Sequence, residues 1–165
     1  IPYQGFLFFG LMNVKGDPFV IEYNVRLGDP ETESLMPRIK SDLLDIFLHT
    51  VQGKLNEIKR ETDPQTEACV MLVSGGYPGD YAKGKIISGF EKIDKSLVFH
   101  AGTYEKDGQI YSNGGRVLCV TGLGDSVKMA QTRAYQGVDT IHFAGMQCRR
   151  DIGFRAIARK RPDGA

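Results

Sequence analysis

The feature that most constrains this chain is the stretch of residues 18–31, where an alternating strand pattern runs directly into a charged turn. Successive side chains of an extended strand point to opposite faces of a sheet. The alternation predicts one apolar face that packs into a core, formed by Phe19, Ile21, Tyr23 and Val25. On the opposite face, Val20 is followed by three polar side chains in a row, those of Glu22, Asn24 and Arg26.

The polar row combines a carboxylate, an amide oxygen and a guanidinium at two-residue steps, roughly 6.5–7 Å apart along a strand. Mg²⁺ prefers hard oxygen ligands and is usually held by one or two protein groups, with phosphates and waters completing its shell. Glu22 and Asn24 therefore fit a metal site, and the planar fork of Arg26 fits a phosphate. A solvated face of an antiparallel sheet would show the same alternation.

The exit from this strand favours a functional site over a plain solvated face. Gly28 can adopt positive φ, and Pro30 keeps Asp29 out of the helical region. Acidic side chains then crowd close to Arg26, namely Asp29, Glu31 and Glu33.

Four segments resemble, in the same order, those of the phosphoribosylamine–glycine ligases, which are ATP-grasp enzymes of purine biosynthesis. The first is Val-Ile-Glu-Tyr-Asn-Val-Arg-Leu-Gly-Asp-Pro-Glu-Thr-Glu at residues 20–33. The others are Ser-Gly-Gly-Tyr-Pro-Gly-Asp-Tyr-Ala-Lys-Gly at 74–84, Ser-Asn-Gly-Gly-Arg-Val-Leu at 112–118 and Arg-Arg-Asp-Ile-Gly at 149–153. The resemblance runs to about residue 158.

This resemblance implies a ligase that phosphorylates glycine with ATP and transfers the glycyl group to 5-phosphoribosylamine, giving glycinamide ribonucleotide, ADP and phosphate. It also implies that Glu22 and Asn24 bind Mg²⁺ or Mn²⁺. From their chemistry we expect Arg26 to lie near the transferred phosphate and Asp29 in the catalytic pocket. A guanidinium that follows two glycines suits a phosphate or carboxylate. Gly114, Gly115 and Arg116 are therefore expected to bind phosphoribosylamine, although a surface salt bridge is equally compatible.

Composition narrows the partners and the compartment. The 165 residues are 41% hydrophobic and carry 21 basic and 20 acidic side chains, a net charge of +1. This balance favours small-molecule substrates over nucleic acid or a membrane surface. Cys69, Cys119 and Cys148 show neither zinc nor disulfide spacing and indicate buried thiols in a reducing cytoplasm. No apolar run approaches the about 18–20 residues of a membrane helix.

The predicted fold class is α+β in two parts. Residues 1–60 are expected to end an ATP-grasp domain, as an antiparallel hairpin with its turn at residues 15–17 and a helix over residues 41–52. The apolar stripe of that helix is expected to be core. Residues 61–165 are expected to form a small antiparallel β barrel or sandwich from short strands, followed by a C-terminal helix over residues 125–139.

Two further patterns leave alternatives open. Residues 74–85 combine glycines with two lysines, but they lack the spacing of a P-loop and favour a wide turn. Arg149, Arg150 and Asp151 fit either a weak site or an exposed ion-pair cluster.

The chain begins with Ile1 in an apparent strand, so we expect a C-terminal piece of a longer enzyme. The family's nucleotide-contacting lysine and phosphate-covering segment lie upstream, in N-terminal and central domains. The piece alone is therefore expected to be inactive. Two alternatives remain, namely a different ATP-grasp ligase or carboxylase and a non-catalytic binding module.

Overall fold

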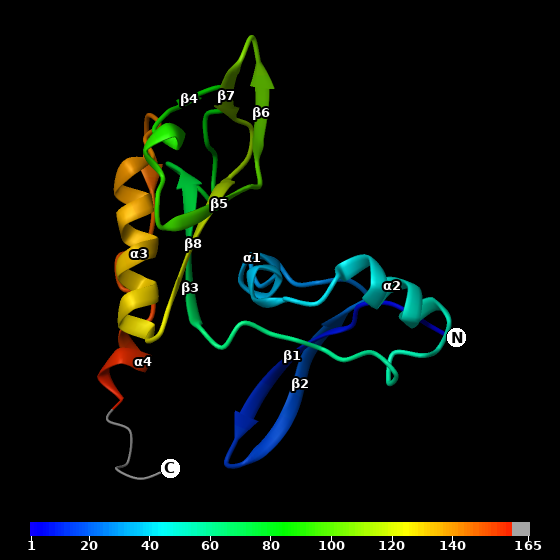
Figure 1. The fold of residues 1–165 in the computed structure, drawn as a ribbon. Coiled ribbons are helices and arrows are strands. Elements are labelled where there is room, and N and C mark those ends of the chain that lie inside the picture. The colour runs from blue at the N-terminus through cyan, green and yellow to red at the C-terminus, as the bar shows by residue number, and fades with distance from the viewer. Residues whose placement is uncertain (160–165) are drawn as a thin grey trace. The chain divides into compact units, whose positions relative to one another are not determined.

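The computed structural model describes residues 1–159, which divide at Asp63 and Pro64 into two compact units. The sequence pattern placed this boundary after residue 60. Each unit contains helices and antiparallel strands, so the chain is of the α+β class (Figure 1). Among the described residues, no helix has the length and apolar character that crossing a bilayer requires.

The first unit is built on a two-stranded antiparallel hairpin, β1 (Phe8–Val14) and β2 (Asp17–Asn24). Its turn residues Lys15 and Gly16 have φ of 56° and 105°. Positive φ at both central positions matches the twist of the flanking strands, which is why such turns suit tight hairpins. The amide of Gly16 also donates to Asn13 Oδ1 at 2.8 Å. The turn chemistry therefore sets which residues pair across the hairpin.

The hairpin is less regular than the alternation predicts. Gly10 pairs with Glu22 while Leu11 pairs with Val20, so Ile21 is an extra residue in β2. A bulge of this kind leaves one residue unpaired and locally disrupts the ladder. The apolar face predicted to be core is also exposed, with Ile21 at 63% and Tyr23 at 67%, because a two-stranded hairpin has no second layer within the described residues.

Three short helices follow in this unit, namely α1 (Thr32–Leu35), a 3₁₀ turn (Met36–Arg38) and α2 (Leu43–Val51). The side chain of Asp42, not that of Ser41, caps α2 by accepting from the amide of Asp45 at 3.1 Å. Ser41 Oγ instead accepts from the amide of Glu61 at 2.7 Å.

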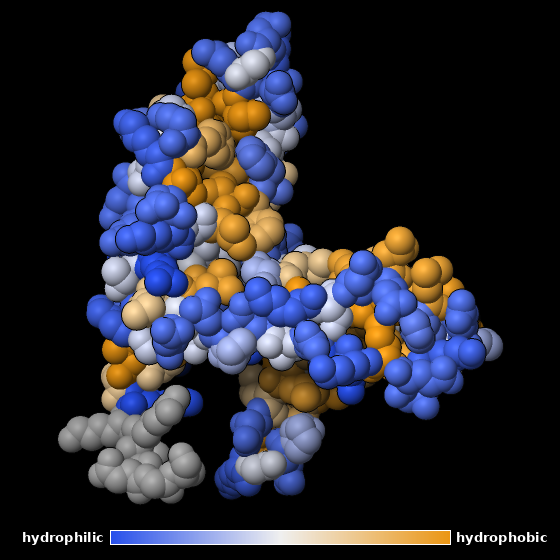
Figure 2. All heavy atoms as spheres, viewed as in Figure 1, coloured by the Kyte–Doolittle hydropathy of each residue, from blue (hydrophilic) through white to orange (hydrophobic). Residues whose placement is uncertain are grey.

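The apolar stripe of α2 was expected to be core, but α2 has no buried residue among those described. Leu44 and Val51 are both 66% exposed, and Phe47 makes an edge contact with Phe6 at 5.7 Å between ring centroids. Figure 2 shows apolar surface around α2 and the hairpin. Helical periodicity finds the stripe, but burial depends on what packs against it.

The second unit holds a four-stranded antiparallel sheet in the order β5-β8-β3-β9, with α3 (Val127–Thr140) packed against it. A three-stranded antiparallel sheet has the order β4-β7-β6. The strands of the larger sheet are β3 (Thr66–Ser74), β5 (Ser96–His100), β8 (Arg116–Gly124) and β9 (Met146–Gln147). Those of the smaller sheet are β4 (Ile86–Ile87), β6 (Thr103–Lys106) and β7 (Gln109–Ser112).

This arrangement corrects the predicted barrel. The two sheets of the second unit are separate in their hydrogen bonding, and the described strands do not close on themselves. The strand spacing is common to barrels and open sheets, and α3 covers the larger sheet where a barrel would have its own strands. A further helix that the pattern did not predict, α4 (Phe154–Ala158), follows the last strand.

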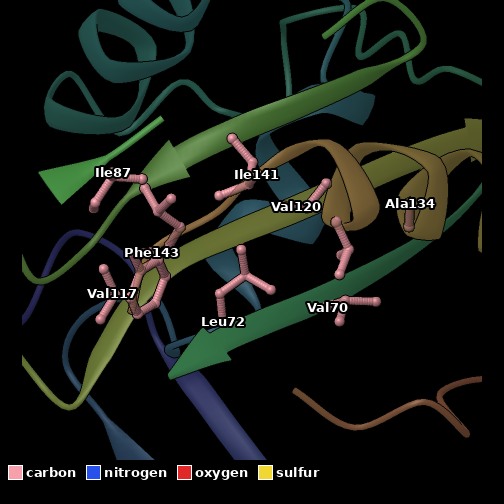
Figure 3. Packing of buried hydrophobic residues seen from close by; sticks show 10 residues of the cluster. Val70, Leu72, Ile87, Val117, Val120, Ala134, Ile141 and Phe143 are labelled. Atoms are coloured by element: carbon pink, nitrogen blue, oxygen red, sulfur yellow. The ribbon is translucent and has the colours of Figure 1, made fainter. Parts of the chain in front are cut away.

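The core of the second unit lies between α3 and the larger sheet (Figure 3). It contains Val70 and Leu72 of β3, Val117 and Val120 of β8, and Phe143 after α3, all at most 1% exposed. The alternate burial of β3 residues reflects one face against the core.

Two glycines allow α3 to approach the sheet closely. A Cβ on Gly122 would overlap the carbonyl oxygen of Ala130 and lie 2.5 Å from the amide nitrogen of Ala134. A Cβ on Gly137 would overlap Ser96 Oγ and lie 2.8 Å from Val120 Cγ1. The backbone of α3 therefore rests directly on β8 and on the start of β5.

Candidate functional site

Glu22 and Asn24 lie at the end of β2, beyond the bulge, and two-residue spacing places them on the same face of the hairpin. Glu22 is exposed and Asn24 is half-buried. Across the ladder from Glu22 stands Gly10, where an added Cβ would lie 3.2 Å from Glu22 Cγ. The glycine thus leaves room for the exposed side chain of Glu22.

The exit loop brings one of the acids expected near Arg26, Glu31, to the end of β2. Gly28 is buried, and a Cβ there would overlap Glu31 Oε2 and lie 3.2 Å from Phe8 Cδ2. Thr32 holds the loop, because its amide and hydroxyl donate to the carbonyl oxygen of Gly28 at 3.1 and 2.5 Å. Phe8 pairs with Asn24, so the carboxylate of Glu31 lies beside the same end of β2. Its position depends on the loop fold, which periodicity does not report.

Arg26 lies outside the strand, contrary to the alternation. β2 ends at Asn24, Arg26 falls in a bend, and its Nη1 donates to the carbonyl oxygen of Leu27 at 2.8 Å. The guanidinium has five N–H donors in all, so this bond leaves others for an anion. Asp29 is exposed on the same loop. Arg26 and Asp29 are thus placed by the loop and not by the strand.

The oxygen donors at the end of β2 fit a divalent cation that is also bound by phosphate oxygens. Among residues 1–159 there is no group of three or more His, Cys, Asp or Glu side chains suited to a metal ion, so no all-protein cage exists there. Mg²⁺ usually takes one or two protein oxygens and keeps waters and phosphates for the rest. Glu22 and Asn24 supply two such oxygens on an accessible face.

The second unit brings two glycine-rich segments together by hydrogen bonds. The amide of Ser74 donates to the carbonyl oxygen of Gly115, and the hydroxyl of Ser74 donates to that of Gly114, both at 2.8 Å. On the other side, the amide of Gly102 donates to the carbonyl oxygen of Arg116 at 2.9 Å. Residues 112–116 are thereby held between the end of β3 and the turn at Gly102. Ser74 and Gly114 are 40 positions apart in the chain, so the local sequence pattern did not predict their hydrogen bond.

Close packing accounts for both glycines of this segment. A Cβ on Gly115 would overlap the ring of Tyr77, and a Cβ on Gly114 would lie 3.0 Å from the Cα of Gly102. The Tyr77 ring in turn meets that of Tyr81 at 6.2 Å between centroids. Arg116 is exposed at the start of β8. Gly114 and Gly115 are therefore needed for packing, whether or not they also contact a ligand.

A pocket of about 240 Å³ adjoins these segments and contains a lysine. Its lining consists of Ser74, Gly75, Ala82, Lys85, Ala144 and Gly145. The amide of Lys85 donates to Ser112 Oγ at 3.1 Å, and its carbonyl accepts from the amide of Ser112 at 2.9 Å. Lys85 is therefore fixed next to residues 112–116. The sequence pattern indicated that lysines follow the glycines, but it did not indicate that Lys85 pairs with Ser112.

The cluster at residues 149–151 is an ion-pair network. Arg149 donates to both carboxylate oxygens of Asp151 at 2.9 and 2.8 Å, and Arg150 pairs with Asp139 at 2.5 Å. The hydrogen bond from Arg149 lowers the pKa of Asp151 below its ordinary value. Tyr135 supports the loop, since its hydroxyl donates to the carbonyl oxygen of Arg149 at 2.9 Å. Of the two readings of this cluster, the structure favours the exposed ion pairs.

Two family models match separate parts of the chain. The C domain of phosphoribosylglycinamide synthetase matches residues 67–155, and the ATP-grasp (A) domain of the same family matches residues 1–32. The first match covers more than half of the chain.

Similar proteins carry one name. Phosphoribosylamine–glycine ligases of Vibrio cholerae and Escherichia coli O157:H7 are 53% and 49% identical over 161 and 162 residues, each across 96% of this chain. A crystal structure of the phosphoribosylamine–glycine ligase of Thermotoga maritima is similar with a TM-score of 0.65 and 38% identity, over 88% of this chain and 36% of that one.

The chain spans about 38% of the length of the two relatives. The match to the C domain is continuous through β3, β8 and α3, and the motifs at residues 74–84 and 112–118 lie within it. The chain therefore belongs to the phosphoribosylglycinamide synthetase family.

Proposed function

We propose that this chain is part of an ATP-dependent ligase that joins glycine to 5-phosphoribosylamine in purine biosynthesis. The glycine carboxylate would attack the γ-phosphorus of ATP, releasing ADP and forming glycyl phosphate. The amine of phosphoribosylamine would then attack the acyl carbon, losing a proton and releasing phosphate to leave glycinamide ribonucleotide. The observation that carries the proposal is the accessible pair Glu22 and Asn24, inside the stretch that matches the ATP-grasp (A) domain.

In this proposal Glu22 and Asn24 hold a divalent cation, Mg²⁺ or Mn²⁺. When bound, the cation would supply neutralisation of phosphate charge. The oxygens of the two side chains suit either ion, and the nearby carboxylate of Glu31 adds negative charge at the same end of β2. Since the described residues contain no group of three or more His, Cys, Asp or Glu side chains there, water and phosphate oxygens would complete the shell of the cation.

We assign Arg26 to the transferred phosphate and Asp29 to the pocket around it. Phosphoryl transfer depends on positioning and on electrostatic stabilisation of charge that spreads over the phosphate oxygens. The planar guanidinium of Arg26 can present two donors to those oxygens. The bond from Arg26 to the carbonyl of Leu27 limits its freedom, which lowers the entropic cost of meeting the phosphate.

We assign Gly114, Gly115 and Arg116 to the phosphoribosylamine. The two glycines keep residues 112–116 close to Ser74 and Tyr77, and Arg116 provides the positive charge. Lys85 is a second cation next to this segment and is added to the proposal for that reason. Of the two cations, Lys85 lines the pocket and Arg116 belongs to the adjacent segment, and such charges suit the phosphate of a sugar phosphate better than a neutral group.

The reaction is proposed to need ATP-grasp residues that precede those matched here, because the ATP-grasp (A) match is confined to residues 1–32 and the chain spans about 38% of its relatives. Residues 1–60 would then end the ATP-grasp domain. We place the enzyme in the cytoplasm, since Cys69, Cys119 and Cys148 are all free thiols.

A coupled assay of ADP release tests this function. The longer protein that contains this chain together with a complete ATP-grasp domain is expected to release ADP only when glycine and 5-phosphoribosylamine are both present. The 165-residue chain alone is expected to release none. Turnover with another amine or with bicarbonate would point to a different ATP-grasp ligase or carboxylase, and turnover by the chain alone would contradict the need for further residues.

Replacement of Arg116 by alanine in the longer protein tests the substrate assignment. Loss of a charged partner of the phosphate is expected to raise the KM for phosphoribosylamine by about 10- to 100-fold, because hydrogen bonds to charged groups are worth about 1.5–3 kcal/mol. The KM for ATP should stay within about twofold. Lys106→Ala, which removes an exposed lysine of β6, serves as the control, and an equal effect of both changes would refute the assignment.

A further inference from the structure

Three cationic side chains line one hollow beside α3. Lys128 and Arg133 belong to α3, and Lys95 immediately precedes β5. The hollow has a volume of about 410 Å³. The rest of its lining is Ser126, Met129, Thr132 and Gln136. Within the described part of the chain, no aspartate or glutamate lines it, so the three charges are concentrated on one spot of a nearly neutral protein.

None of the three cations is ion-paired among the residues that the structure describes. Arg133 Nη1 donates to the carbonyl oxygen of Leu123 at 2.7 Å, and Lys128 Nζ donates to Gln131 Oε1 at 3.3 Å. Both bonds go to neutral oxygens and leave other N–H donors on each group. Lys95 has no side-chain hydrogen bond or ion pair within residues 1–159. In contrast, Arg149 and Arg150 of the same unit are both paired with aspartates.

The acids nearest in sequence, Asp125 and Asp94, do not line this hollow. Asp125 precedes the hollow, and its Oδ1 accepts from Gln65 Nε2 at 3.0 Å. Asp94 lines an adjoining hollow of about 250 Å³, which shares Lys95, Arg133 and Gln136 with the first one. Within residues 1–159 no ion pair joins Asp94 to Lys95 or Arg133, so direct pairing with this carboxylate does not neutralise the two cations.

The part of α3 that lines the hollow is packed closely against β8. A Cβ on Gly124 would lie 2.7 Å from Met129 Cγ and 2.9 Å from the amide nitrogen of Ala130, so the first half of α3 rests on the end of β8. Arg133 is half-buried and tied to Leu123, the residue before Gly124. A guanidinium fixed in this way loses little side-chain entropy when it meets an anion.

We propose that Lys95, Lys128 and Arg133 form a binding site for the diphosphate group of a small molecule. A planar guanidinium and two ammonium groups match closely spaced phosphate oxygens, and the site has neutral donors in Gln136 and Ser126. Ser126 Oγ already accepts from the amide of Met129 at 3.2 Å, so its hydroxyl hydrogen is the group that remains to donate. The volume falls in the range of about 300–1,000 Å³ typical of small-molecule sites.

The proposed site is distinct from the segment at residues 112–116. β8 runs from Arg116 to Gly124, and the hollow adjoins its Gly124 end. At about 3.3 Å per strand residue, the two ends of β8 are roughly 25 Å apart. A diphosphate in the hollow would therefore not occupy the segment that contains Arg116.

Titration of the 165-residue chain with sodium pyrophosphate at constant ionic strength, followed by amide chemical shifts in NMR, tests the proposal. We expect saturation with a Kd on the order of 1 mM or tighter. The shifts should be confined to Lys95 and residues 126–136. A parallel titration with adenosine diphosphate identifies the source: tighter binding at the same amides assigns a nucleoside diphosphate, and equal binding assigns the diphosphate group alone.

The variants isolate the charges. Joint replacement Lys95→Gln and Lys128→Gln, both at exposed positions, is expected to weaken pyrophosphate binding at least about tenfold. Arg133→Lys keeps the charge but loses the planar fork, and should weaken binding while the fold is kept. Lys106→Gln is the matched control in the same unit and should change the Kd less than about twofold. A linear titration without saturation, or an equal effect of Lys106→Gln, would overturn the proposal.

Discussion

Replacement of Glu22 by alanine in the protein with its complete ATP-grasp domain is expected to lower kcat/KM about a thousandfold, which corresponds to about 4 kcal/mol of transition-state stabilisation. The side chain is exposed at the end of β2 and has no apolar packing to lose, so the fold should remain intact. The physical cause is loss of an anionic oxygen from a site that has only Asn24 as its other assigned ligand. Steady-state ADP release at saturating glycine measures the effect.

A metal titration separates this role from a structural one. Glu22→Ala should shift the Mn²⁺ concentration for half-maximal activity upward by at least about tenfold, because a charged ligand is worth more than a neutral oxygen. Asp17→Asn removes a carboxylate from the other end of the same strand and is the matched control, with activity within about twofold of the parent. If Glu22→Ala keeps full Mg²⁺-dependent activity, the metal assignment is wrong and a non-catalytic binding module becomes the better reading.

Replacement of Phe143 by alanine is expected to give the largest loss of stability, about 3–5 kcal/mol. Phe143 is 1% exposed and packs with Leu72, Val117 and Ile141 in the core of the second unit (Figure 3). Truncation removes the transfer free energy of the ring and leaves a cavity that its neighbours fill only in part. The chain has no tryptophan, so urea unfolding is best followed by circular dichroism.

Two further phenylalanine variants serve as controls for Phe143→Ala. Phe154→Ala removes a ring that is 48% exposed in α4 and should change the free energy of unfolding by about 1 kcal/mol or less. Phe143→Leu keeps most of the apolar volume and should cost less than Phe143→Ala. Equal losses for Phe143→Ala and Phe154→Ala would show that the core does not depend on the buried ring.

The pattern of local sequence was sufficient for several elements. The sequence pattern predicted the last long helix over residues 125–139, and α3 spans Val127–Thr140 with Ser126 Oγ accepting from the amide of Met129. Ala130, Ala134 and Val138 of this helix are buried at helical spacing, and Val127 is half-exposed. Such features depend on neighbours within one or two turns, which the sequence lists directly.

Prediction failed where an outcome depended on distant partners. The α2 stripe and the apolar face of β2 have correct periodicity, but neither is buried among the described residues. A barrel or sandwich was inferred from strand spacing, and the described strands form no closed barrel, because strand spacing does not say which strands pair. Ile21 interrupts an alternation that appears continuous, because a bulge is decided by the register of two strands together.

The sequence by itself determined the strand that carries Glu22 and Asn24, the glycine-rich turns and the ordered motifs that mark the family, since each rests on side-chain type and short-range spacing. Only the tertiary structure decided that Ser74 holds Gly114 and Gly115, that Glu31 lies close to Gly28, and that Lys95 and Arg133 line one hollow. The physical reason is that hydrogen bonds and close packing between remote segments depend on how the chain folds back on itself. Local periodicity reports only on neighbours in the sequence.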